Sequence, residues 1–151
     1  EYEINFAKYN VINLLNEFAK KHKKLLIITG NNPVFYDESG INPALSILLK
    51  NKKNNLSTEE LEKLYYKRLN NKFESIAKKV KALSAELDII FLDKYDYSCV
   101  LNSKVCSLLT DEKKLIYFDG IHYTKSGAKY FGEIIYKTDW LSPLDDYFKK
   151  N

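Results

Sequence analysis

An aspartate and a histidine, three positions apart, are the residues best placed to do chemistry in this chain. Asp119 and His122 lie in a segment, 117–128, that reads Tyr-Phe-Asp-Gly-Ile-His-Tyr-Thr-Lys-Ser-Gly-Ala. On one tight turn, the carboxylate can accept a hydrogen bond from the imidazole Nδ1–H and fix the tautomer of the ring. The Nε2 atom can then take a proton from a hydroxyl group. The spacing alone also fits a turn aspartate beside a surface histidine.

The residues around this pair are suited to hold a catalytic base still. Gly120 lets the turn bend without a clash from a Cβ atom. Thr124 can cap a helix that we expect over 125–137. Gly127 and Ala128 are small enough for that helix to pack closely.

The elements that must position this segment alternate between helices and apolar strands. Apolar residues at helical spacing, short apolar runs and a capping box at 57–60 mark them. We expect helices over 3–21, from the capping box to about 86 and over 125–137, and buried parallel strands over 25–29 and 89–92. This order predicts an α/β fold in which the two strands are adjacent and parallel.

Two strands do not make a stable parallel sheet by themselves. We therefore expect strand 25–29 to pair on its other side with strands outside this sequence, and residues 1–151 to form the C-terminal part of a three-layer domain. Smaller elements are expected too: a loop over 30–42, helices near 43–49 and 104–109, and a tail that packs through Trp140, Leu144 and Phe148.

Composition argues against several classes of partner. The formal net charge is only +4, and the one dense basic run, at 20–24, is interpreted as a solvated helix end, so no nucleic-acid partner is predicted. No apolar stretch reaches the roughly 18 residues that would span a bilayer. Cys99 and Cys106 lack the two further ligands of a zinc site, and we expect neither a metal nor a cofactor.

The string Asp-Gly-Ile-His-Tyr-Thr-x-x-Gly-Ala resembles the last conserved block of the SGNH hydrolases. The resemblance extends over most of the chain, since 4–30 and 70–92 are similar to the last two helix–strand units of that family. It implies a flavodoxin-like fold, with Asp119 and His122 as the acid and base that assist a serine nucleophile.

One subgroup of the family is especially similar: the SGNH domains fused to integral-membrane acyltransferases that O-acylate bacterial surface polysaccharides. The resemblance lies in an insertion at about 37–68 and in the pair Cys99 and Cys106. It implies a disulfide between these cysteines and a periplasmic or other extracytoplasmic location. It also implies four partners: an acyl donor, a carbohydrate acceptor, the N-terminal remainder of the domain and a membrane acyltransferase domain.

The chain departs from the family in lacking its Gly-Asp-Ser nucleophile block. Ser39 and Ser126 are interpreted as a turn residue and a helix residue, so we expect the nucleophile outside this chain and the chain alone to be inactive. Asn32 is a candidate oxyanion donor, and Tyr36 and Tyr123 are candidate substrate-lining residues.

The predicted function is serine-based acyl chemistry on a carbohydrate, by O-acetyl transfer or ester hydrolysis. Two alternatives remain open. A non-catalytic carbohydrate-binding or scaffolding domain would keep a relic of the site. An unrelated flavodoxin-like binding module would have no hydrogen bond between Asp119 and His122.

Overall fold

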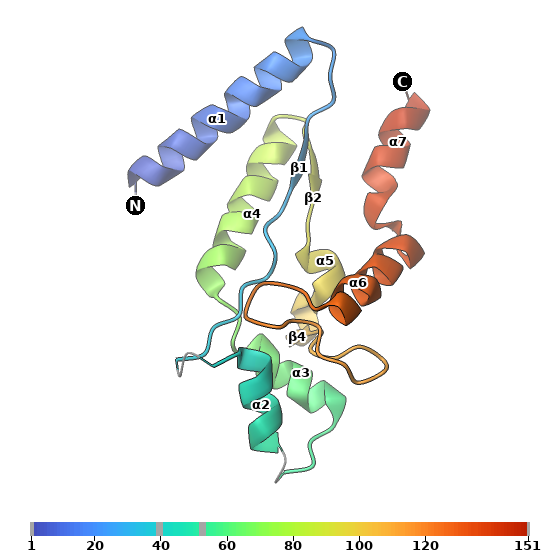
Figure 1. Ribbon diagram of the computed structural model, residues 1–151. Coiled ribbons are helices and arrows are strands. Elements are labelled where there is room, and N and C mark those ends of the chain that lie inside the picture. The colour runs from blue at the N-terminus through green and yellow to red at the C-terminus, as the bar shows by residue number, and fades with distance from the viewer. Residues whose placement is uncertain (1, 39–40, 52–53, 151) are drawn as a thin grey trace.

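The computed structural model describes residues 2–38, 41–51 and 54–150 (Figure 1), with the side chains of 2–9 left aside. Seven α-helices and four short strands alternate along these ranges. In chain order they are α1 Tyr2–Lys21, β1 Ile27–Thr29, α2 Pro43–Asn51, α3 Thr58–Tyr66, α4 Asn71–Glu86, β2 Ile90–Leu92, α5 Tyr95–Ser98, β3 Cys99–Val100, β4 Val105–Cys106, α6 Lys125–Lys137 and α7 Ser142–Lys150. The fold class is α/β, as predicted.

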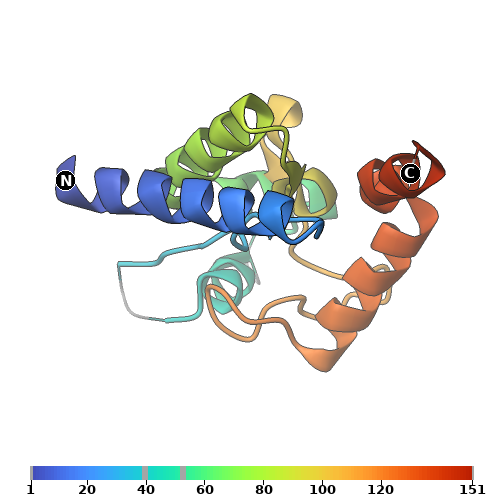
Figure 2. The same ribbon diagram turned by 90° about the horizontal axis from the view of Figure 1, so that it is seen from above.

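The parallel strand pair forms where the sequence predicts it. Strand β1 pairs with β2 in the register Ile27 to Ile90 and Thr29 to Leu92. The Gly30 N–H extends the ladder by donating to the Leu92 carbonyl at 2.9 Å. Figures 1 and 2 show α4 on one side of this pair and α6 and α7 on the other. The layering agrees with part of a flavodoxin-like domain.

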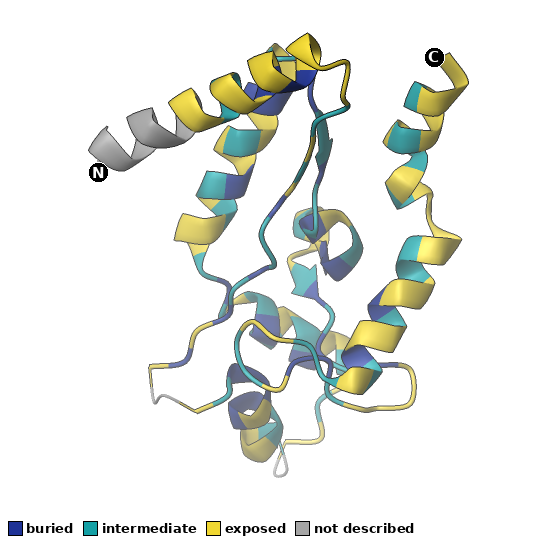
Figure 3. Ribbon diagram, turned by 45° about the horizontal axis from the view of Figure 1, so that its top comes forward, coloured by how far each residue is buried: buried dark blue, intermediate teal, exposed yellow. Residues whose placement is uncertain are grey.

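Strand β1 was expected to be buried, and this prediction is wrong. Ile27 and Thr29 are exposed, because β1 pairs only with β2 within the described residues and its other edge is open. Helix α1 begins one residue before the predicted start and ends at the predicted residue, yet much of its apolar face is exposed as well (Figure 3). The exposed apolar residues of α1 are Val11, Leu14, Leu15 and Phe18.

The long helix predicted up to residue 86 is two helices, α3 and α4. The capping box that starts α3 is confirmed: the Ser57 side chain accepts from the Glu60 N–H, and Glu60 accepts in return from the Ser57 N–H. The helix breaks after α3 because residues 68–70 pair with the distant segment 34–36. Tyr36 N–H donates to the Arg68 carbonyl at 2.8 Å, and Asn70 then caps α4.

The helix predicted near 104–109 is absent, and an antiparallel hairpin, β3–β4, stands in this region. Its turn places Lys104 in the left-handed region, with φ at 54°. A lysine gives no sequence signal for such a turn, because glycine and asparagine are its usual residues. Cys99 and Cys106 face each other across the hairpin and form the expected disulfide.

The core lies directly beneath the segment 117–124. Phe35 stacks on Tyr65 with ring centroids 3.8 Å apart, and Tyr117 and Phe131 pack around them. These four aromatic side chains are almost completely buried. The loop that carries Asp119 and His122 therefore packs on a buried aromatic cluster.

The C-terminal tail packs on the body in part. Trp140 donates from its indole N–H to the Asp93 carbonyl at 2.7 Å and contacts the Tyr97 ring. Leu144 is half-buried, but Phe148 is exposed, contrary to expectation. Within the described residues, no helix is both long and apolar enough to cross a membrane.

Candidate active site

Asp119 and His122 form the expected hydrogen bond on a single turn. Asp119 Oδ2 lies 2.7 Å from His122 Nδ1. The other carboxylate oxygen, Oδ1, accepts from the backbone N–H groups of Ile121 and His122, at 2.7 and 2.6 Å. The carboxylate is therefore fixed by the turn that it spans. It in turn orients the imidazole ring, with Nε2 as the nitrogen left for a substrate or nucleophile.

The ends of the turn are closed by a short antiparallel pairing. Tyr117 forms a bridge with Tyr123, and the Phe118 N–H donates to the His122 carbonyl at 3.1 Å. Thr124 follows as the N-cap of α6: its Oγ1 accepts from the Gly127 N–H at 2.9 Å. Helix α6 has the predicted bounds, 125–137, and the predicted cap.

Both glycines of the segment are required by close backbone contacts. A Cβ atom on Gly120 would overlap the Phe35 carbonyl oxygen, and one on Gly127 would overlap the Ile116 carbonyl oxygen. Phe35 N–H also donates to the Gly120 carbonyl at 2.9 Å, so the turn that carries Asp119 and His122 packs against the chain that follows β1. Ala128 is exposed, and the close packing expected of it belongs to Gly127 alone.

The acid–base pair is open to solvent. The His122 side chain is 66% exposed and the Asp119 side chain 43%. Partial burial raises the pKa of Asp119, but the hydrogen bonds from His122 and the Ile121 N–H outweigh it and leave the pKa below its ordinary value. Asp119 is therefore a carboxylate at neutral pH and can stabilise an imidazolium. The exposed Phe118 ring stacks beside the imidazole, with centroids 5.6 Å apart.

The pair lies at the carboxyl end of β1, the edge at which open α/β sheets bind ligands. The Tyr123 hydroxyl donates to Asn32 Oδ1 at 3.2 Å, which joins the catalytic segment to the loop after β1. A second hydroxyl, on Tyr97, lies 3.5 Å from that of Tyr123. Burial and the neighbouring tyrosines raise the pKa of Tyr123, so its hydroxyl keeps its proton.

The remaining residues singled out by the sequence are Tyr36, Ser126 and Ser39. Tyr36 is exposed and follows Phe35, the residue bonded to the catalytic turn. Ser126 lies in the first turn of α6, as expected. Ser39 lies outside the described residues.

Sequence reasoning missed three residues that support the site: Phe35, Tyr97 and Asn42. The Asn42 carboxamide accepts from the Leu45 N–H at 3.0 Å, as a helix cap does, and donates to the Tyr117 carbonyl at 3.4 Å. Asn followed by Pro is a helix-start signal that could have revealed this cap. Phe35 and Tyr97 act through tertiary packing and carry no local signal. No three His, Cys, Asp or Glu side chains among the described residues gather as a metal site would require.

The Asp–His contact has the geometry by which a carboxylate orients the histidine of a Ser-His-Asp site. The family model of the SGNH domain fused to AT3 domains matches residues 2–137, so the chain belongs to this SGNH family. The match includes both parallel strands and the Asp–His turn. No curated protein and no solved structure matches the chain. Membership indicates acyl-transfer or esterase-type chemistry.

Proposed function

We propose that this chain supplies the Asp–His half of an SGNH-type serine acyl-transfer site. The reaction is O-acetyl transfer to a bacterial surface carbohydrate, or ester hydrolysis on it, and the serine comes from outside this chain. One observation carries the proposal: the 2.7 Å contact between Asp119 Oδ2 and His122 Nδ1, in a member of the SGNH family. The same contact disfavours an unrelated flavodoxin-like binding module.

The geometry fits a two-step acyl transfer. The serine Oγ attacks the acyl carbonyl carbon as His122 Nε2 takes the hydroxyl proton, and Asp119 stabilises the resulting imidazolium. The tetrahedral intermediate collapses when His122 gives this proton to the departing alkoxide. Water or a sugar hydroxyl then attacks the acyl-serine carbon while His122 takes its proton. The bond to serine Oγ breaks, His122 returns the proton to Oγ, and the acyl group leaves as an acid or a new ester.

Asn32 is proposed as a donor to the carbonyl oxygen of the intermediate. Because the Tyr123 hydroxyl donates to Asn32 Oδ1, the amide is oriented and Nδ2 remains as its donor. A donor held in advance stabilises a developing oxyanion without reorganisation. Tyr36, exposed beside the turn, is proposed to line the path of the substrate.

The proposed setting is the periplasm or another extracytoplasmic compartment, beside a membrane acyltransferase domain of the same protein. The disulfide between Cys99 and Cys106 supports this setting, because such bonds persist in oxidising compartments. The family description, with its fusion to AT3 domains, supports the membrane partner. The N-terminal remainder of the domain would supply the serine and further strands.

Variants of the acid–base pair test the proposal in the intact protein that carries the serine. His122→Ala should abolish nearly all acyl turnover, and Asp119→Asn should cost on the order of 10⁴-fold, as in the serine protease template. Turnover is measured with an aryl acetate, and circular dichroism checks the fold. His22→Ala, in the exposed turn directly after α1, is the matched control and should retain full activity.

Two results would count against the proposal. Normal turnover in His122→Ala would favour the alternative, a carbohydrate-binding or scaffolding domain with a relic site. Robust aryl acetate hydrolysis by the 151-residue chain alone, lost on mutation of one of its own serines, would place the nucleophile within this chain.

A further inference from the structure

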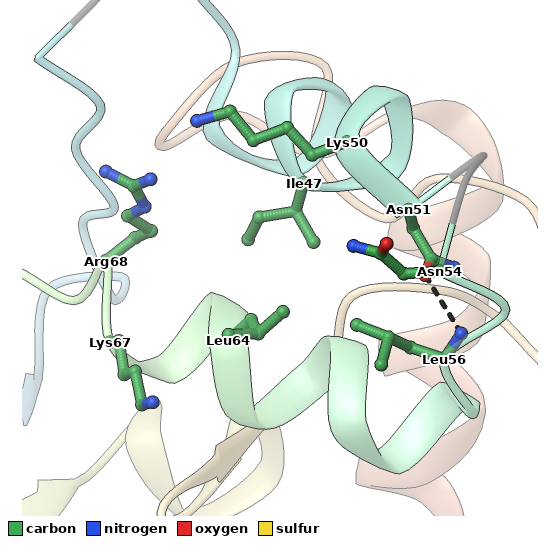
Figure 4. A pocket seen from close by; sticks show the side chains of 8 residues that line it. All are labelled: Ile47, Lys50, Asn51, Asn54, Leu56, Leu64, Lys67 and Arg68. Atoms are coloured by element: carbon green, nitrogen blue, oxygen red, sulfur yellow. Dashed lines mark hydrogen bonds between the residues drawn. The ribbon is translucent and has the colours of Figure 1, made fainter.

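A cleft with a volume of about 300 Å³ separates α2 from α3, and the acyl chemistry described above does not use it. Its size is at the lower end of the roughly 300–1,000 Å³ that small-molecule sites occupy. Figure 4 shows Ile47 and Leu64 facing each other across its middle.

The two ends of the cleft differ in chemistry. The cationic side chains that line it are Lys50, Lys67 and Arg68; Figure 4 shows Lys50 and Arg68 at one end, and Lys67 below Arg68 with its amine pointing away from the other two. Two carboxamides, of Asn51 and Asn54, lie at the other end, beside Leu56. No carboxylate is among the described residues that line it. A ligand that fits this pattern has an anionic group at one end, an apolar middle and hydrogen-bonding groups at the far end.

The hydrogen bonds of the lining residues show which groups remain for a ligand. Arg68 contacts the buried carboxylate of Asp37 at 3.5 Å, so Lys50 and Lys67 carry the excess positive charge. At the far end the Asn51 carboxamide oxygen accepts from the Leu56 N–H at 2.9 Å. That bond leaves the Asn51 amide nitrogen as a donor toward a hydroxyl or carbonyl oxygen.

An acidic sugar matches these groups better than a lipid does. Its carboxylate suits the lysine end, its C–H face suits Ile47 and Leu64, and its hydroxyls suit the two carboxamides. A fatty chain would instead place apolar atoms against Asn51 and Asn54, which costs free energy when their hydrogen bonds to water are lost.

The cleft is built into the same packed unit as the catalytic turn. The Tyr36 N–H donates to the Arg68 carbonyl. Phe35, the residue before Tyr36, donates its N–H to the Gly120 carbonyl in the turn. Tyr36 therefore lies between the cleft and the acid–base pair along a continuous run of backbone contacts. Its exposed ring offers a surface on which a sugar between the two could stack.

We propose that the cleft between α2 and α3 binds an acidic sugar of the polysaccharide acceptor and so directs a neighbouring residue of that chain to His122. The role as acceptor site rests on the proposed function, whereas the binding itself does not need acyl chemistry. The site thus selects carboxylate-bearing polysaccharides over neutral ones.

The test is calorimetric titration of the protein with oligosaccharides of glucuronic, galacturonic or sialic acid. At least one should bind saturably, and its methyl ester should bind about tenfold or more weakly, because the ester loses the charged hydrogen bonds. Lys50→Gln combined with Lys67→Gln should weaken the acid form by a similar factor. Lys72→Gln combined with Lys79→Gln, two exposed lysines of α4, makes the same change in net charge and should have no effect.

Three outcomes would overturn the assignment: saturable binding by none of the three acids, equal binding of acid and ester, or unchanged affinity in the Lys50 and Lys67 variant. Lysine-dependent binding to vesicles of anionic phospholipid, in preference to the sugars, would assign the cleft to a lipid headgroup instead. His122→Ala should bind the sugar normally, and the control variant of Lys72 and Lys79 should hydrolyse an aryl acetate normally. Failure of binding and failure of catalysis are therefore separate results.

Discussion

The two carboxylate oxygens of Asp119 have different hydrogen-bond partners. Oδ1 holds the turn through two backbone N–H groups, and Oδ2 holds the imidazole. An aspartate that only orients a histidine would need other residues to fix its own position. Here the orienting group and its support are contained within four consecutive residues, which explains how so exposed a pair keeps a defined geometry.

The contact between Tyr123 and Asn32 leads to a prediction about a positioning residue. Tyr123→Phe removes the hydroxyl that orients the Asn32 amide, so kcat should fall about tenfold with little change in KM, while Asn32→Ala should cost about 10²–10³-fold. Combining the two changes should add little to the Asn32→Ala loss, because one acts through the other. Aryl acetate kinetics of the intact protein provide the measurement.

Tyr136→Phe is the matched control for this pair, since Tyr136 is 90% exposed on α6. It should leave kcat and KM unchanged. Fully additive losses in the double variant would show that Tyr123 does not work through Asn32.

At the scale of elements, substitution by alanine should have opposite effects on stability at the two glycines of α6. Gly132 has no atom within 4 Å of where a Cβ would lie, so Gly132→Ala should stabilise the helix by about 1 kcal/mol. Gly127→Ala forces a methyl group onto the Ile116 carbonyl and should destabilise by about 1–3 kcal/mol. Urea unfolding of the two variants measures both changes. Equal effects of the two substitutions would mean that α6 does not pack closely at Gly127.

Elements with local signals were predicted well from the sequence. Helix α6 begins and ends where Thr124 and the apolar spacing indicate, and the hydrogen bonds between Asp119 and His122 form within one turn. The break between α3 and α4 was missed because residues 68–70 leave the helix to pair with 34–36, a partner that the local pattern does not reveal. The hairpin at Lys104 and the contact between Phe35 and Gly120 were missed because neither has a signal in the local sequence.

At the scale of the whole molecule, the open edge of β1 and the apolar face of α1 lie next to each other in the sequence. We predict that Leu14→Asp combined with Phe18→Asp leaves this chain folded, because both side chains are exposed in it. The same changes should weaken its binding to the proposed N-terminal remainder of the domain, supplied as a separate polypeptide. Co-purification and thermal unfolding measure the two effects.

Tyr136→Asp places a charge on another exposed apolar position and should not affect that binding. If the α1 variant binds the remainder as well as the unaltered chain does, the apolar face is not the surface that it covers. Unfolding of the α1 variant on its own would instead mean that the face is needed within this chain.

The contact between Gly120 and Phe35 joins an early segment of the chain to a late one. Closing so long a loop costs entropy, and contacts of this kind form slowly. A nascent polypeptide carries Phe35 for some time before Gly120 is synthesised. The place of the turn on the domain therefore depends on a long-range contact, whereas the hydrogen bonds that join Asp119 to Ile121 and His122 are local. Local bonds thus set the shape of the turn, and the contact with Phe35 sets its position against the core.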